Sequence, residues 1–419
     1  MKRSLLFSLF LISYIVNAST NVKGGIYSNT TWTKANSPYI VTDTIVVFPG
    51  VTLTIQPGVT VEFANNVELE IRQATLIALG TSSDSIIFTS NATFPTPGIY
   101  SGIYLDPGDT TKFSYCHFCY ANTAITDPIN STYASFTHCN FNLNIYGIQY
   151  LSAVGIVDSC NFRNNTSAIY WSATILIENC NAIKNTNGIT NSESTITDCI
   201  IDSNANIGFS CWVNGVCKLK NCEIKYNGIG VIGGSHDSIC SNLIEDNNIG
   251  IKLGTNDIYL CNSICNNTKY NLFDSIAINQ SLNHNYWCLT DSAKIQATIY
   301  DGYQNIHYGL VFFTPFDTLP CKSVGDTTII TSLSAINENI NFISIYPNPV
   351  TNELFINLHQ AIDGILTLTN VFGQDVYSTK ISGSDGSTQK INTSNLQQGV
   401  YFLKMESNGQ ILTKKVLKI

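Results

Sequence analysis

The sequence FSYCHF at residues 113–118 returns as FTHCNF (136–141), VDSCNF (157–162), IENCNA (177–182), ITDCII (196–201) and LKNCEI (219–224). SNLI (241–244) and NSIC (262–265) follow in the same phase. The repeated position, called here the cysteine position, is assigned to Cys116, Cys139, Cys160, Cys180, Cys199, Cys222, Leu243 and Ile264. The steps between these residues run from 19 to 23 residues, which is the period of a solenoid.

Other positions of the repeat are equally regular. The position three before the cysteine position is apolar in every repeat, which indicates an inward-facing stack: Phe113, Phe136, Val157, Ile177, Ile196, Leu219, Cys240 and Cys261. The position five after it holds asparagine, which can turn the chain and bond its stacked neighbours: Asn144, Asn165, Asn185, Asn204, Asn227 and Asn248. A small residue followed by an apolar one, as in Gly147-Ile148, then begins a further strand.

These short apolar runs predict an all-β fold. Strands of three to five residues need backbone partners in the coils above and below, and stacking as parallel strands provides them. The coils would then rise about 4.8 Å each. Leucine-rich and helical repeats require patterns that this sequence does not contain. We therefore predict a parallel β-helix, a solenoid that is followed by a small antiparallel β-sandwich.

The chain is predicted to consist of four segments. Residues 1–18 fit a secretory signal peptide, with Lys2-Arg3, an apolar run and Ala18 before the cleavage point. Residues 19–320 form the β-helix, with an opening cap near Trp32 and Tyr39 and a closing cap that contains a short helix from Ser292 to Thr298. Residues 321–342 have a linker composition, and residues 343–419 read as the β-sandwich. No later stretch is apolar enough for a transmembrane segment.

The cysteine spacing bears on which disulfides can form, and the net charge bears on which partners the protein can bind. The chain has 14 cysteines, but side chains stacked in register lie about 4.8 Å apart, farther than a relaxed disulfide allows. We predict buried thiols in the repeats and one disulfide between Cys288 and Cys321. The net charge is −8 and only Arg72 and Arg163 remain after signal removal, so nucleic acid is not an expected partner.

The last segment resembles the C-terminal sorting domain of the type IX secretion system of Bacteroidetes bacteria. The resemblance rests on Tyr346-Pro347-Asn348-Pro349, Asn370-Val371-Phe372-Gly373, Leu396, Gly399-Val400-Tyr401-Phe402 and Thr413-Lys414-Lys415-Val416. It implies that the secretion machinery is a partner and that the protein reaches the cell surface or the medium. Its implied signal residues are Tyr346, Pro347, Asn348, Pro349, Gly373, Gly399, Tyr401, Lys414 and Lys415.

Residues from about Tyr39 to Phe316 are similar to right-handed β-helix repeat proteins of the same bacteria. TLTIQPGVTVEF (52–63) and the ending NYWCLTD (285–291) carry this likeness. Such proteins include lyases, glycosidases, adhesins and inert shafts, so the likeness implies the right-handed architecture and leaves the activity open. Relatives often have Gly where this chain has Cys288, and this departure agrees with the predicted disulfide.

Two groups of residues are candidates for function. Asp158, Glu178 and Asp198, with Arg163 and Lys220 nearby, are candidates for acid-base catalysis in a glycosidase or lyase. The alternative is that they are solvated surface charges. Tyr150 and Trp171 share a repeat phase, with Tyr170 beside Trp171, and the three are candidates for stacking on a sugar, or for ordinary packing.

No metal-ligand spacing, cofactor motif or Gly-x-Ser-x-Gly elbow is present. We predict no metal or cofactor, with a single adventitious Ca²⁺ left open. The main hypothesis is non-catalytic binding of polysaccharide or another surface. A polysaccharide lyase or glycoside hydrolase, and a rigid spacer without ligand, are the alternatives.

Overall fold

The computed structural model describes residues 19–106, 110–127, 133–150, 155–212, 215–321, 343–358, 362–370, 374–384, 386–407 and 410–419. The chain divides into two compact units, Met1–Thr327 and Thr328–Ile419. The proposed signal peptide and all of the proposed linker except Cys321 lie outside the described residues, as does Gly373 of the sorting signal.

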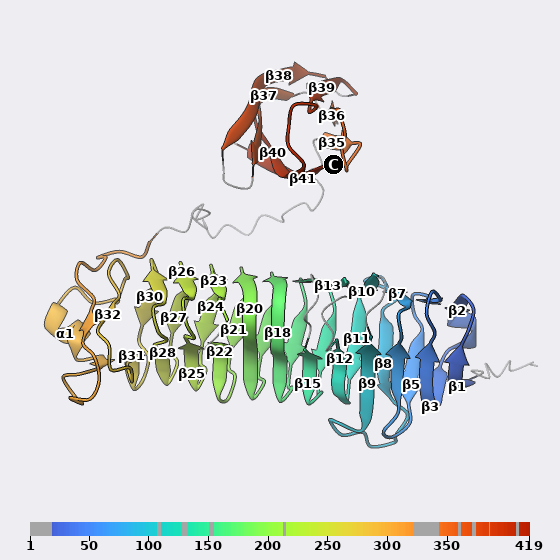
Figure 1. Ribbon diagram of the computed structural model, residues 1–419, viewed down its shortest axis with the longest axis horizontal. Helices are drawn as coiled ribbons and strands as arrows, with labels where there is room; N and C mark the ends of the chain where they lie inside the picture. Colours follow the sequence, from blue (N-terminus) through green and yellow to red (C-terminus); the bar gives the residue numbers. More distant parts are fainter. Residues whose placement is uncertain are drawn as a thin grey trace, which may run out of the picture. The chain divides into compact units, whose positions relative to one another are not determined.

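The first unit is a parallel β-helix, seen in Figure 1 as a row of stacked coils from blue to yellow. Each coil contributes one strand to each of three parallel sheets, and the solenoid prediction is confirmed. Sheet 1 contains β2 (Thr30–Trp32), β4 (Thr52–Ile55), β7 (Thr75–Leu79), β10 (Thr111–Ser114), β13 (Ala134–Thr137), β16 (Gly155–Asp158), the ends of β18 (Ser167–Glu178) and β20 (Asn187–Thr197), β23 (Lys218–Lys220), β26 (Ser238–Cys240) and β29 (Ile258–Leu260).

In most coils, the residue at the cysteine position is the first residue of the sheet 2 strand or directly precedes that strand. The strands of sheet 2 are the start of β3 (Tyr39–Val47), β5 (Thr60–Phe63), β8 (Ile86–Ser90), β11 (Cys116–Cys119), β14 (Asn140–Asn142), β17 (Asn161–Arg163), β19 (Asn181–Ile183), β21 (Ile200–Asp202), β24 (Glu223–Lys225), β27 (Leu243–Glu245) and β30 (Ser263–Cys265).

Sheet 3 follows the asparagine corner. Its strands are the end of β3, β6 (Glu68–Ile71), β9 (Tyr100–Leu105), β12 (Ala121–Thr126), β15 (Tyr146–Gln149), the starts of β18 and β20, β22 (Ile207–Cys211), β25 (Ile229–Ile232), β28 (Ile249–Lys252), β31 (Tyr270–Phe273) and β33 (Ile299–Tyr300).

Side chains of one kind stack along the interior. Phe118, Phe141 and Phe162 lie in register, with ring centroids 4.8 and 4.6 Å apart. These separations equal the strand spacing of a sheet, so each ring packs on the ring of the next coil. The repeating sequence therefore produces a continuous dry core along the solenoid axis.

The buried-thiol prediction is confirmed for the six cysteines at the cysteine position, which are unpaired and at most 2% exposed: Cys116, Cys139, Cys160, Cys180, Cys199 and Cys222. Each thiol lies near the carbonyl oxygen two residues earlier, for example Cys180 Sγ at 3.1 Å from Glu178 O. The thiol also accepts from the previous coil, since the Cys160 N–H lies 3.4 Å from Cys180 Sγ. The cysteines thus act as small interior residues that also satisfy the corner backbone.

The last two assignments of the cysteine position are wrong. Leu243 pairs with Glu223, so the residue in register with Cys222 is Asn242. Asn262 and Asn285 continue this column, through Asn242 N–H to Asn262 Oδ1 at 3.0 Å and Asn262 N–H to Asn285 Oδ1 at 2.9 Å. At this point the buried side chains of the column change from cysteine thiols to asparagine amides. The neighbouring apolar column accordingly continues with Ile239 and Tyr259 instead of Cys240 and Cys261.

The asparagine corner forms the predicted ladder. Asn165 donates from Nδ2 to Phe141 O at 2.9 Å and to Asn185 Oδ1 at 3.0 Å, and its Oδ1 accepts from the Asn144 backbone at 2.9 Å. The ladder then runs through Asn204 and Asn227 to Asn247, where Asn248 had been expected. Every member is buried and bonded to the next coil, so the ladder fixes the register.

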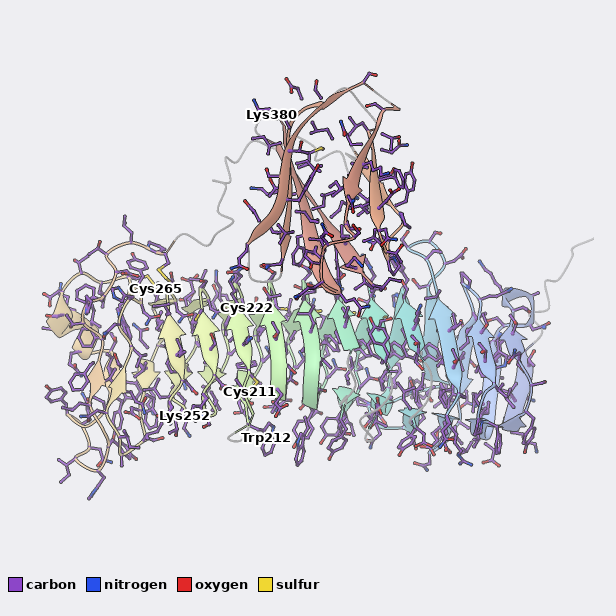
Figure 2. The ribbon with its side chains drawn as sticks, turned by 45° about the horizontal axis from the view of Figure 1, so that its top comes forward. Cys211, Trp212, Cys222, Lys252, Cys265 and Lys380 are labelled. Atoms are coloured by element: carbon purple, nitrogen blue, oxygen red, sulfur yellow. A yellow bond between two sulfur atoms is a disulfide. The ribbon has the colours of Figure 1, made fainter. Side chains whose placement is uncertain are left out.

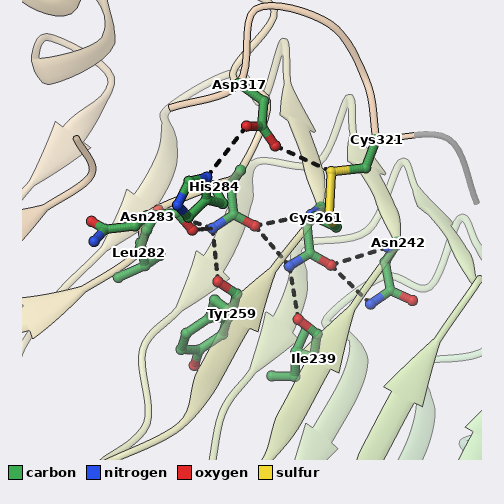
Figure 3. The surroundings of a disulfide bond; sticks show 11 residues. Ile239, Asn242, Tyr259, Cys261, Leu282, Asn283, His284, Asp317 and Cys321 are labelled. Atoms are coloured by element: carbon green, nitrogen blue, oxygen red, sulfur yellow. Dashed lines mark hydrogen bonds and ion pairs between the residues drawn. A yellow bond between two sulfur atoms is a disulfide. The ribbon is translucent and has the colours of Figure 1, made fainter. Parts of the chain in front are cut away.

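Three disulfides join cysteines outside the thiol column: Cys211–Cys217, Cys261–Cys321 and Cys265–Cys288. The predicted pairing of Cys288 with Cys321 is therefore wrong. Cys261 leaves the interior at a corner, with φ of 57°, where its side chain meets Cys321 of the closing segment. Figure 3 shows this bond beside Asp317, whose carboxylate lies 3.1 Å from Cys321 Sγ and 3.6 Å from His284 Nδ1.

Both ends of the solenoid carry irregular elements. At the start, β1 (Thr20–Ile26) pairs with β3, η1 (Lys34–Asn36) follows β2, and Trp32 stacks on Tyr39 at 4.9 Å. At the end, α1 (Ser292–Gln296) is capped by the Asp291 carboxylate, and β32 (Gln280–Ser281) pairs with β34 (Val311–Phe312). The predicted helix is present and ends two residues earlier than expected. No helix among the described residues is long and apolar enough to cross a membrane.

The second unit contains two antiparallel sheets, as predicted. One has β35 (Ile343–Tyr346), β36 (Glu353–Leu358) and β39 (Thr388–Asn392). The other has β38 (Asp375–Gly383), β37 (Ile362–Asn370), β40 (Gly399–Ser407) and β41 (Gln410–Lys418). Their shared core includes Leu354, Leu366, Leu403 and Val416.

Candidate functional site

An aromatic ridge lies at the corner between sheets 3 and 1. It consists of Tyr150, Trp171 and Trp212, which are 37, 43 and 39% exposed. Ring centroids are 5.5 Å apart between Tyr150 and Trp171 and 4.8 Å apart between Trp171 and Trp212. Tyr170 meets Trp171 edge-on at 6.1 Å. The three predicted aromatic residues are thus brought together, and Trp212 completes the group.

The two tryptophans stack across an intervening coil. Tyr170 pairs with Thr190 and Ser172 pairs with Asn191, so Trp171 is an extra residue that bulges from the corner. Trp212 follows Cys211, which pairs with Asn191. The backbone N–H of Trp212 donates to Asn191 O at 3.0 Å. Because the coil of Asn191 places no ring at this point, the indoles on either side of it reach each other.

The sequence reading missed Trp212. Tyr150 and Trp171 lie eleven residues after their cysteines, whereas Trp212 lies thirteen after Cys199, so a fixed repeat phase passes over it. The signal that could have found it is the pair Cys211 and Cys217, whose short separation marks a closed loop next to a tryptophan. Figure 2 shows Trp212 beside Cys211, projecting from the edge of the solenoid.

The ring faces of the ridge are not equally available. Trp171 contacts two rings of the ridge, because Trp212 stacks on it at an interplanar angle of 14° and Tyr150 meets it at a tilt of 39°. The next coil after Trp212 has Gly233 and Gly234 near this corner, and among the described residues Trp171 is the one ring that Trp212 stacks on. Trp212 is therefore the end ring and the better candidate for face-on contact with a ligand.

A hollow of about 620 Å³ opens on sheet 1 next to the disulfide loop. Its lining combines apolar and polar residues: Ile175, Leu176, Glu193, Ser194, Thr195, Val216 and Lys218. Glu193 and Lys218 are exposed, and the Ser194 hydroxyl is buried without a hydrogen-bond partner among the described residues. The Cys211–Cys217 bond lies next to Trp212 of the ridge and to Val216 of the hollow. The same disulfide therefore constrains a residue of each.

The proposed carboxylate cluster is only partly assembled. Asp158 and Glu178 are in register on adjacent strands. Thr197, not Asp198, is the next residue in that column, and Lys220 follows it. Asp198 occupies the corner with φ of 55° and accepts from its neighbour Thr197 at 2.7 Å.

Local hydrogen bonds engage the Asp158 carboxylate. Asp158 Oδ1 accepts from Ser159 Oγ and from Asn179 Nδ2, both at 3.0 Å. Arg163 lies beyond the corner on the outer face of sheet 2, in register with Asn142 and Ile183. The structure therefore places Arg163 on a different sheet from Asp158.

Among the described residues, two groups have the composition of a metal site. One contains Cys211, Cys217 and Asp237, and the other Cys261, Asp317 and Cys321. In both groups the sulfur atoms are joined in disulfides, and a disulfide sulfur is not the thiolate that binds metal ions. Asp237 instead accepts from the Cys217 and Gly234 backbones, each at 2.8 Å.

The sorting-signal residues fix the last strand of the second unit. Asn348 donates to Lys415 O and accepts from Leu417 N, both at 2.8 Å. Tyr346 stacks on Phe355 at 5.6 Å, and the Tyr401 hydroxyl donates to Gln397 O at 2.9 Å. Pro347, Pro349 and Lys415 are exposed, Lys414 is half-buried, and Gly399 begins β40.

Family models match three parts of the chain. Residues 344–419 match the secretion system C-terminal sorting domain, residues 101–249 the right handed beta helix region, and residues 24–112 the pectate-lyase like beta helix domain. Protein bark beetle of Drosophila melanogaster is 44% identical over 69 residues. That match spans 16% of this chain and only 2% of that protein.

Solved structures with a similar fold are distant in sequence. A mutant of the periplasmic alginate epimerase AlgG is 13% identical, with a TM-score of 0.42 and coverage of 65% of this chain and 77% of that chain. An alginate lyase from Paenibacillus sp. is 11% identical, with a TM-score of 0.31 and coverage of 64 and 93%. A tailspike of an Acinetobacter baumannii bacteriophage, described as a capsular polysaccharide depolymerase, is 12% identical, with a TM-score of 0.28 and coverage of 87 and 73%. Similarity at this level carries no information about activity.

Proposed function

We propose that this right-handed β-helix protein, which ends in a type IX secretion sorting domain, binds a polysaccharide at its aromatic ridge without cleaving it. The sorting domain directs the chain out of the cell, to the cell surface or the medium. There the solenoid meets extracellular polymers. A site for such a polymer has to be open, elongated and rigid, and these are the properties of the ridge and the adjoining hollow.

The observation that carries the proposal is the stack of Trp171 and Trp212. Indole rings that are exposed to water raise the free energy of the folded protein, because apolar surface is poorly solvated. No core packing explains this exposure, since the interior is filled by other aromatic columns. The apolar face of a pyranose ring covers an indole well while its hydroxyls stay hydrated. The disulfide loop holds Trp212 in place, which lowers the entropy cost of binding.

The hollow supplies the polar contacts that such a ligand needs. The Lys218 ammonium can donate to sugar hydroxyls, and the Glu193 carboxylate can accept from them. Leu176 and Val216 provide apolar contact beside them. A mostly apolar depression with a few polar groups is the usual form of a binding site for small groups.

The second candidate function is hydrolysis or lyase chemistry around Asp158 and Glu178. The register of these two residues on adjacent strands favours it. The hydrogen bonds from Ser159 and Asn179 to Asp158 favour a structural role instead, since they bind the carboxylate to the corner. Asp158→Asn with Glu178→Gln distinguishes the two, because only an enzyme loses product formation in that variant.

The test is retention of the protein by immobilised plant, algal and host polysaccharides. We expect retention by at least one polymer and its loss in Trp212→Ala, with retention kept in Tyr226→Ala. Tyr226 is a suitable control because it is an exposed aromatic residue on another corner, 59% accessible against 39% for Trp212. Equal retention of the Trp212→Ala variant would contradict the proposal.

A further inference from the structure

Arg163 differs from Arg72, the other arginine of the described solenoid, and from Lys225, a cation on its own outer column of sheet 2. Arg72 is paired with Glu70, whose Oε2 lies 2.8 Å from Arg72 Nη2. Lys225, on the same outer column of sheet 2 as Arg163, lies 2.7 Å from Glu223 and 2.8 Å from Glu245. Among the described residues, Arg163 has no carboxylate within ion-pair distance, although it is exposed and fixed in the middle of a rigid sheet.

The side chains around Arg163 are amides in place of carboxylates. A hollow of about 470 Å³ on sheet 2 contains Arg163 and is lined also by Asn140, Asn142, Asn161, Asn164 and Asn181. Asn142 is the register partner of Arg163 on the preceding coil. Asn161 precedes Arg163 by two residues on the same strand and therefore points to the same outer face.

The hydrogen bonds of two of these amides involve their oxygen atoms as acceptors. Asn142 Oδ1 accepts from Asn164 Nδ2 at 2.9 Å, and Asn161 Oδ1 accepts from Asn181 Nδ2 at 2.8 Å. Both acceptors are used, whereas the amide nitrogens of Asn142 and Asn161 donate to no group among the described residues. The guanidinium has donors only. The hollow therefore offers several N–H groups, one positive charge and no competing carboxylate.

We propose that Arg163, Asn142 and Asn161 form an oxyanion-binding site that takes a sulfate ester or a carboxylate group of a glycan. A guanidinium fork binds such oxygens in a bidentate manner, and the two amide groups donate from either side. The protein carries a net charge of −8, so attraction of an anionic polymer has to come from a local site of this kind and not from the overall charge. The site lies on sheet 2, apart from the aromatic ridge, and does not depend on the function proposed for that ridge.

Three polymers with one backbone test the site: dextran, dextran sulfate and carboxymethyl dextran. Affinities are measured for the whole chain at one fixed salt concentration, with Arg163→Gln, Asn161→Asp and Arg72→Gln. Asn161→Asp keeps the acceptor for Asn181 but replaces the donor with a negative charge. Arg72→Gln removes the other arginine of the solenoid and is the matched control.

We expect binding of at least one charged polymer and no binding of dextran through this site. Arg163→Gln and Asn161→Asp should each weaken that binding about ten-fold or more, while Arg72→Gln leaves it unchanged. Preference for dextran sulfate would identify a sulfate ester, and preference for carboxymethyl dextran a carboxylate, as the natural group. The inference is overturned if neither charged polymer binds, or if both site variants bind as the unaltered chain does. Thermal unfolding of each variant checks that the fold is retained.

Discussion

The backbone N–H of Cys222 donates to the side-chain oxygen of Asn242 at 2.9 Å, and at this bond the column of thiols becomes a column of amides. Between thiol coils the same N–H lies 3.4 Å from a sulfur, as for Cys180 and Cys199. Thiol and amide therefore perform one task at this corner, which is to satisfy a buried N–H of the preceding coil. The amide does so with a stronger acceptor and adds donors of its own.

The amide column should be sensitive to substitution. Asn262 accepts from Asn242 N at 3.0 Å and donates to Ile239 O at 2.8 Å and to Asn285 Oδ1 at 3.0 Å. Asn262→Ala leaves these buried groups unpaired, so we expect the free energy of unfolding to fall by about 2–4 kcal/mol. Urea unfolding measures this loss. The exposed Asn206→Ala should change it by less than about 0.5 kcal/mol, and equal effects of the two substitutions would refute the structural role.

The thiol column should be unreactive in the folded protein. Burial raises the pKa of the Cys116 and Cys222 thiols, and all six column thiols are at most 2% exposed, so an alkylating reagent has little access to the column in the folded protein. We expect Cys119 and Cys240, which are half-buried, to be labelled first, and the six column thiols only after denaturation. Peptide mapping after timed labelling identifies each site. Rapid labelling of Cys160 in the folded state would show that the column is open.

The closing cap should depend on its disulfides. Cys261–Cys321 joins residues 60 positions apart, and a loop of that length corresponds to a stabilisation of about 4 kcal/mol in the chain-entropy model. The double variant Cys261→Ser with Cys321→Ser should therefore unfold its cap at lower denaturant concentration. Non-reducing peptide mapping gives the pairing directly. A peptide linking Cys288 to Cys321 would contradict the arrangement described above.

The cap should also lose stability as pH rises from about 4 to 6. Burial, and then the negative charge of Asp301, raise the pKa of Asp274 to about 6. The folded state keeps a proton that the unfolded chain releases, so the free energy of unfolding falls through this interval and stays lower above it, by about 3 kcal/mol. Asp274→Asn cannot titrate and should lack this contribution. Parallel pH profiles of the two proteins would show that Asp274 has an ordinary pKa.

The coil architecture was predictable because each coil repeats one set of requirements. Apolar residues such as Phe118 and Phe141 must stack inward, and Asn165 must bond the next coil, so the period appears directly in the sequence. The register failed at Asn242 for a physical reason. An interior position normally favours an apolar residue, and this preference drew the assignment to Leu243, although a bonded amide was the residue that replaced the thiol.

The candidate site was less predictable because it depends on irregularities of the coil. Trp212 meets Trp171 only because the coil between them is shorter at the corner and carries Asn191. The role proposed for Arg163 depends on its having no carboxylate within ion-pair distance among the described residues, which sequence order does not reveal. The disulfide partner of Cys321 likewise depends on Cys261 turning outward at a corner.

The most direct test of the central claim is a calorimetric titration with a polysaccharide that retains the protein, combined with an assay for released reducing ends. We predict saturable binding, about ten-fold or greater weakening in Trp212→Ala, unchanged binding in Tyr226→Ala, and no release of ends. Affinity that survives the loss of Trp212 would contradict the assignment of the ridge. Release of reducing ends that stops in Asp158→Asn would contradict non-catalytic binding and establish an enzyme.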